Sequence, residues 1–161
     1  MLQSAIYFSL VFACWAYAMR CGGAPERIGI SILGVGSILT VVAASTPTVR
    51  FGAVEIGIFL VDVGALLGFL ILALRAERWW PLWVTSLQAI GTTAHAVKLM
   101  DPEVIRWAYA FALAFWSYPM LFLLALGTWN HQRRLARFGV DKSWSSSSGR
   151  SAPQPPIGPI G

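Results

Sequence analysis

We expect an all-α membrane protein: a polytopic bundle of five transmembrane helices with a short disordered tail at its C-terminus. Of the 161 residues, 57% are apolar and 12% are charged, whereas charged residues make up about a quarter of a soluble domain. Five continuous apolar runs each approach the roughly 20 residues that a helix needs to cross a bilayer. None of these runs alternates polar with apolar residues, so a membrane β-barrel is excluded as well.

The first three runs are residues 2–19, 28–45 and 54–74. No basic residue precedes the first run. A secretory signal needs a basic N-terminal region, so we expect a retained helix. The break after the first run contains Gly22, Gly23 and Pro25, and the break after the second contains Pro47. Glycine, proline and charged residues directly after an apolar run favour the end of a helix.

The last two runs are residues 79–97 and 104–127, and the fourth is the most polar of the five. The distribution of basic residues along the chain still favours a fourth transmembrane span. With five spans, nine of the 12 Lys and Arg residues share a side with the C-terminus and three lie on the other side, whereas four spans divide them six to six. Basic residues are enriched in cytoplasmic loops. We therefore expect a bacterial inner (cytoplasmic) membrane protein with its N-terminus outside and its C-terminus in the cytoplasm.

A basic segment, residues 129–142, follows the last run and is followed by a Ser/Pro/Gly-rich tail, residues 143–161. Arg133, Arg134 and Arg137 lie there among aromatic and aliphatic residues, a pattern that suits contact with anionic lipid headgroups. The alternative is an ordinary positively charged stop after a span. The tail cannot bury a core and is expected to be disordered. The net charge of +5 suits a lipid surface, and no nucleic-acid-binding module is recognisable.

Ionisable and polar residues inside the third and fourth runs form the candidate site, because such groups are unfavourable at bilayer depth unless they have a role. Glu55 and Asp62 are seven residues apart, or about two helical turns. In the next run, Gln88 and His95 have the same spacing within a polar stripe. Consecutive helices pack antiparallel, so we expect Asp62 to meet Gln88 and Glu55 to meet His95, with a protonated Asp62 donating to the Gln88 carbonyl.

Two basic residues and two glycines complete the set of candidate residues. Lys98, one turn beyond His95, and Arg106, at the start of the fifth run, could join the outer polar cluster. Gly64 and Gly68 form a Gly-x-x-x-Gly pattern, which favours close helix packing in membranes. The sequence contains no recognisable zinc, nucleotide or nucleophile motif, so we predict no cofactor and no metal and lean away from an enzyme.

Three functions remain open on the sequence alone. The first is an accessory or scaffold subunit of a larger membrane assembly, with partners that are the lipid bilayer, other membrane proteins or further copies of the chain. In this hypothesis the polar contacts hold helices together. The second is a small proton-coupled carrier that uses Asp62, Glu55 and His95, since histidine titrates near neutral pH. The third is a lipid-modifying enzyme with Glu55 and His95 as acid and base. We take the first as the working hypothesis.

Overall fold

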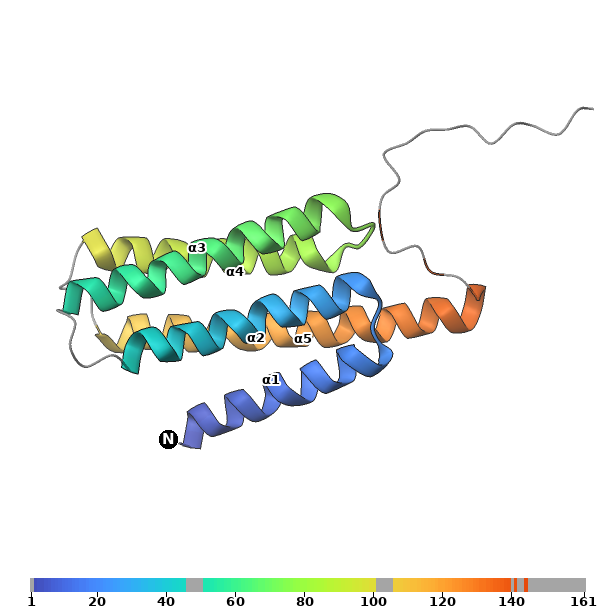
Figure 1. The fold of residues 1–161 in the computed structure, drawn as a ribbon, viewed down its shortest axis with the longest axis horizontal. Coiled ribbons are helices and arrows are strands. Elements are labelled where there is room, and N and C mark those ends of the chain that lie inside the picture. Colours follow the sequence, from blue (N-terminus) through green and yellow to red (C-terminus); the bar gives the residue numbers. More distant parts are fainter. Residues whose placement is uncertain (1, 46–50, 101–105, 140, 142–143, 145–161) are drawn as a thin grey trace, which may run out of the picture.

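The computed structural model describes residues 2–45, 51–100, 106–139, 141 and 144, with side chains described for 5–44, 56–100, 116–139, 141 and 144. Within these residues the chain forms five α-helices and no strand (Figure 1). The all-helical prediction is therefore confirmed for the described part of the chain. The helices are α1 (Leu2–Cys21), α2 (Ala24–Ser45), α3 (Phe51–Arg75), α4 (Trp80–Met100) and α5 (Arg106–Phe138).

The helix ends follow the local sequence. The N–H of Gly22 bonds to the carbonyl of Ala18 at 2.8 Å just past the end of α1, and Pro25 lies at the second position of α2, where its missing N–H is tolerated. The last helix ends at Gly139, which has a φ of +70° and whose N–H bonds to Leu135 O at 2.9 Å. This is the left-handed C-terminal cap that glycine adopts readily. Thus α5 continues well past residue 127, the end of the predicted span.

The bundle consists of helical hairpins packed side by side. Helix α3 contacts both α2 and α4, and α5 contacts α4, α1 and α2. In Figure 1, α1 lies on the opposite side of the α2 and α5 pair from the α3–α4 hairpin. The α1–α2 and α3–α4 turns lie at the same end of the bundle, where α5 extends beyond the other helices. The charged residues of these turns are thereby brought near the C-terminal part of α5.

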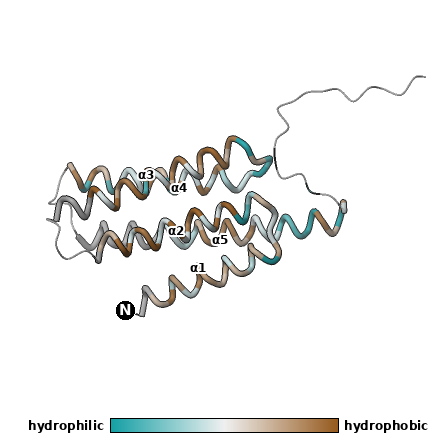
Figure 2. The backbone as a smooth tube through the Cα atoms, in the orientation of Figure 1, coloured by the Kyte–Doolittle hydropathy of each residue, from teal (hydrophilic) through white to brown (hydrophobic). Residues whose placement is uncertain are grey.

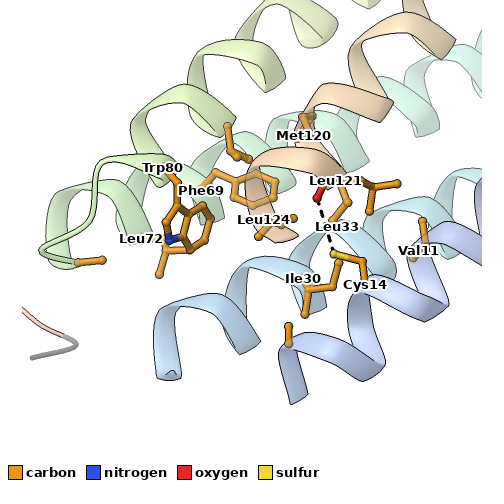
Figure 3. Close-up of a cluster of buried hydrophobic side chains, with 13 residues drawn as sticks. Val11, Cys14, Ile30, Leu33, Phe69, Leu72, Trp80, Met120, Leu121 and Leu124 are labelled. Atoms are coloured by element: carbon orange, nitrogen blue, oxygen red, sulfur yellow. Dashed lines mark hydrogen bonds between the residues drawn. The ribbon is translucent and has the colours of Figure 1, made fainter. Parts of the chain in front are cut away.

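The apolar core draws residues from all five helices, as Figure 3 shows. Trp80 is its largest member and is 1% exposed. Gly29 on α2 and Gly127 on α5 lie against its indole ring. The buried apolar residues are Val11, Cys14, Ala18, Ile30, Leu33, Phe69, Leu72, Ala76, Trp80, Val84, Met120, Leu121 and Leu124.

Most of the apolar surface of α2 and α3 faces outward. In the described part of the chain, Ala24–Ala44 and Ile56–Arg75 are the two stretches long and apolar enough to cross a membrane. Only 17% and 11% of their most apolar windows are buried inside the bundle, whereas a core helix of a soluble protein buries most of such a surface. Figure 2 shows the apolar residues along these helices and the hydrophilic C-terminal part of α5. The polar stripe lowers the hydropathy of α4, and the described side chains of α5 begin only at residue 116.

Candidate functional site

A polar cluster joins α3 to α4 through Asp62, Gln88 and His95. The Gln88 amide Nε2 lies 3.3 Å from Asp62 Oδ1 and 3.4 Å from the Asp62 backbone carbonyl oxygen. On the other carboxylate oxygen, His95 Nε2 lies 2.9 Å from Asp62 Oδ2. The Asp62 side chain is 20% exposed and that of His95 is 11% exposed. One carboxylate of α3 thus receives two separate polar groups of α4.

The spacing of the polar residues on α4 explains why they face the bundle. Gln88, Thr92 and His95 are four and then three residues apart, so they share one helix face, and all three are buried. The Thr92 hydroxyl bonds to the Gln88 carbonyl at 2.9 Å, and Thr85 further along the stripe bonds to the Pro81 carbonyl at 2.7 Å. The two threonine hydroxyls are therefore satisfied within α4, while Gln88 and His95 reach α3.

The structure pairs Asp62 with Gln88, as predicted, and adds His95 as a second partner of Asp62. The equal spacing on the two helices predicted that His95 meets Glu55, whose side chain lies outside the described residues. The described side chains place His95 against Asp62. The donor to Asp62 is the Gln88 amide, not a protonated carboxyl of Asp62 donating to Gln88. Asp62 lies within reach of both Gln88 and His95, and each carboxylate oxygen takes one partner.

The other predicted members of this cluster are not all within the described residues. The side chains of Glu55 and Arg106 lie outside them, although the backbone of each belongs to its helix, α3 and α5 respectively. Lys98 is partly buried near the end of α4. Of the two packing glycines, Gly68 faces α2, where an added Cβ would lie 3.1 Å from Ile32 Cδ1. Gly64 is exposed, with nothing within 4 Å of an added Cβ.

A second cluster, which the sequence analysis did not assemble, occupies the end of the bundle where α5 extends beyond the other helices. We call it the end cluster; its residues are Glu26, Arg78, Trp80, His131, Arg134 and Asp141. The guanidinium of Arg78 holds the Asp141 carboxylate through two hydrogen bonds of 2.7 Å. His131 Nδ1 lies 2.5 Å from Asp141 Oδ2, and Arg134 Nε lies 3.1 Å from Oδ1. Asp141 therefore ties the residues after α5 to the α3–α4 turn.

Glu26 forms the inner part of the end cluster. It is fully buried at the start of α2, and its Oε1 accepts a hydrogen bond of 3.1 Å from the indole N–H of Trp80. Arg78 Nε lies 3.7 Å from the same oxygen. Buried charges are tolerated in proteins when they are paired and hydrogen-bonded. The cluster pairs these charges by placing Arg78 between two carboxylates, while Glu26 Oε2, Arg78 Nε and Arg134 Nε are buried without a hydrogen-bond partner among the described residues.

Electrostatics at Asp141 favour its charged form. Burial alone would raise the pKa of this carboxyl, but the hydrogen bonds from Arg78 and His131 and the charges of Arg78 and Arg134 outweigh burial and lower the pKa. A carboxylate that accepts several charge-assisted hydrogen bonds is stabilised in this way. The end cluster is thus a built ionic site and not a chance surface contact.

The arginines predicted to contact lipid have more specific roles in the structure. Arg134 is engaged by Asp141, and the Arg133 guanidinium carbon lies 4.6 Å from the centre of the Trp129 ring, a cation–π distance. Arg137 is exposed in the last turn of α5. One sequence signal for the end cluster was available: Asp141 is the single acidic residue after Glu103 and follows three arginines.

Chemically, the two clusters can hold helices in register and can hold protons. The Asp62–His95 and Asp141–His131 pairs each combine a carboxylate with an imidazole. Among the described residues, no group of three or more His, Cys, Asp or Glu side chains could hold a metal ion. No protein-family model and no solved structure matches the chain.

Proposed function

We propose that this chain is a small five-span inner-membrane protein that acts as an accessory or scaffold subunit of a larger membrane assembly. The observation that carries the proposal is that the interior polar groups connect helix to helix. Asp62 joins α3 to α4, and Glu26, Arg78 and Asp141 join α2, the α3–α4 turn and the segment after α5. Such contacts hold membrane helices in a fixed arrangement, as a scaffold requires.

The outward apolar surface supports the same proposal. Leu60, Leu67 and Leu74 on α3 are more than half exposed, and contiguous apolar surface of this kind marks contact with lipid or with other proteins. Gly64 lies on α3 among these leucines and leaves room for a partner helix. Small residues permit close approach of helix backbones in membranes.

The five-span topology can be tested by labelling. In a background with Cys14→Ala and Cys21→Ala, a single cysteine is placed by Arg75→Cys, Arg133→Cys or Lys98→Cys and exposed to a membrane-impermeant thiol reagent. We expect the first two to label from the cytoplasmic side and the third from the outside. Labelling of Arg75→Cys and Arg133→Cys from different sides would overturn the topology.

The scaffold function is tested by purification in mild detergent after expression at native level. We expect a stoichiometric membrane-protein partner to co-purify, and Asp62→Asn to retain it. Gly64→Leu should reduce the amount of this partner that co-purifies. Gly91→Leu is the matched control, because an added Cβ at Gly91 on α4 also meets nothing within 4 Å. A chain that is recovered alone in every case would contradict the proposal.

A proton-coupled carrier is the second candidate, favoured by the 2.9 Å approach of His95 to Asp62 in a largely buried position. In this alternative Asp62 carries the proton, with Glu55 and His95 providing access. Asp62→Asn would then abolish pH-dependent flux into liposomes while the protein stays folded. Unchanged flux would remove this alternative. The lipid-modifying enzyme needs Glu55 beside His95, and the Glu55 side chain lies outside the described residues.

A further inference from the structure

A pocket of about 250 Å³ opens beside the end cluster, on the C-terminal part of α5. Its α5 lining consists of Asn130, Arg133, Arg134, Arg137 and Phe138, and Trp79 from the α3–α4 turn closes one side. The α5 residues are spaced three and four apart, so they share one face of the helix. Basic residues on a single helix would form only a charged surface. Here the α3–α4 turn contributes Trp79, and the two elements together form a pocket.

In the described part of the chain, the arginines around this pocket outnumber the carboxylates that contact them. Asp141 contacts Arg134 of the pocket and also Arg78. The two carboxylates of the end cluster, Glu26 and Asp141, face Arg78 and Arg134, and the pocket adds the guanidinium groups of Arg133 and Arg137. Arg134 presents further N–H donors beyond the Nε that faces Asp141, because a guanidinium carries five in all. The pocket therefore combines positive charge with donors suited to the oxygens of an anion.

We propose that this pocket binds a phosphate group, supplied by the headgroup of an anionic phospholipid or by a free phosphate. Arginine matches phosphate oxygens through its planar array of N–H donors, and the Asn130 side-chain amide adds a further donor. Trp79 and Phe138, which are 41% and 74% exposed, give the rim an apolar component. Tryptophan is typical of the membrane–water interface, where a headgroup phosphate lies.

The size of the pocket limits what it holds. Its volume lies below the roughly 300–1,000 Å³ of sites that enclose drug-sized ligands. It therefore suits a phosphate group and the atoms next to it, with any acyl chains outside. A phosphate site in the pocket differs from general attraction of the basic segment to a negatively charged surface. General attraction needs no pocket, and every arginine at that end of the bundle would contribute to it equally.

Binding of a lipid headgroup depends on the proposed membrane location of the chain, whereas binding of a free phosphate does not. The experiment uses the full chain in detergent and native mass spectrometry, with phosphatidylglycerol, phosphatidylcholine and inorganic phosphate as separate probes. The variants are Arg133→Gln, Arg137→Gln and the two combined. Arg20→Gln is the matched control, since Arg20 is an exposed arginine in the last turn of α1 and does not line the pocket. Circular dichroism and elution volume show whether each variant is folded.

We expect retention of phosphatidylglycerol over phosphatidylcholine, with a loss of about fivefold in affinity for each pocket arginine removed and no change in Arg20→Gln. If inorganic phosphate binds and shows the same losses while neither lipid does, the source is a free phosphate. The proposal is overturned if no probe binds, or if Arg20→Gln weakens binding as much as the pocket variants. Membrane insertion is scored separately by the labelling experiment, so failure of one proposal does not imply failure of the other.

Discussion

Oδ2 of Asp62 on α3 lies 2.9 Å from Nε2 of His95 on α4, while Oδ1 of the same carboxylate receives the amide of Gln88 at 3.3 Å. One side chain therefore fixes two points of the neighbouring helix. Sliding α3 along α4, or rotating it, would break both contacts at once. Asp62 therefore helps to fix the register of the α3–α4 hairpin.

The first prediction concerns the coupling of Asp62 to His95. In a double-mutant cycle of Asp62→Ala and His95→Ala, we expect the two changes to be non-additive by about 1 kcal/mol in the free energy of unfolding, the usual size of a polar contact between membrane helices. The measurement is unfolding of the full chain in mixed detergent and SDS micelles, followed by circular dichroism.

The control cycle pairs Asp62→Ala with Thr93→Ala. Thr93 is exposed on α4, and its hydroxyl bonds to Ala89 O within its own helix. These two changes should be additive. Equal coupling in the two cycles would show that the Asp62–His95 contact contributes nothing specific.

The hairpin illustrates how far sequence patterns lead. The helical period and the spacing of the polar residues predicted that Asp62 of one helix faces Gln88 and His95 of the next. The structure brings these three residues together. The choice of partner for His95 was not accessible, because a seven-residue spacing does not define the vertical offset between helices to better than about one turn of 5.4 Å. An offset of that size decides whether Asp62 lies within reach of His95, as it does in the structure.

The end cluster was missed for a different reason. Glu26 and Arg78 lie in the short charged breaks between the predicted spans, and such breaks are usually solvated, so the sequence analysis used their charges only as markers of topology. Both residues are buried, Glu26 against Trp80 and Arg78 against Asp141, which returns from beyond α5. That contact spans 63 positions in sequence, and no local periodicity reports it.

The second prediction concerns the packing of Trp80. An added Cβ at Gly127 would lie 2.6 Å from Trp80 Cδ1 and 2.8 Å from Nε1. The indole cannot move aside freely because its N–H is bonded to the buried Glu26. We expect Gly127→Ala to lower the free energy of unfolding by about 1–3 kcal/mol, as overpacking of a core does.

Gly91→Ala is the control for this change, since an added Cβ there meets nothing within 4 Å. Alanine is favoured over glycine in a helix by up to about 1 kcal/mol, so this variant should be neutral or slightly more stable. Detergent unfolding of both variants checks the prediction. If Gly127→Ala were as stable as Gly91→Ala, the tight contact with Trp80 would be contradicted.

The third prediction concerns pH. The contacts with Arg78, His131 and Arg134 lower the pKa of Asp141 in the folded chain below its ordinary value of 3.8. A carboxyl whose pKa is lowered by folding contributes stability that is complete above its unfolded pKa and is lost as the pH falls through the folded pKa. At neutral pH we expect Asp141→Asn to be less stable than the natural chain by about 1–3 kcal/mol, the usual contribution of hydrogen bonds to charged groups. The difference should shrink below about pH 4, where Asp141 of the natural chain also becomes protonated. Thermal unfolding of both proteins across this range gives the difference directly and cancels the titration of carboxyls that the two share.

Glu77→Gln serves as the control, because Glu77 is an exposed acid in the α3–α4 turn next to Arg78, and it should show little effect at any pH. A difference between Asp141→Asn and the natural chain that grew on acidification would mean that the Asp141 contacts do not stabilise its charged form.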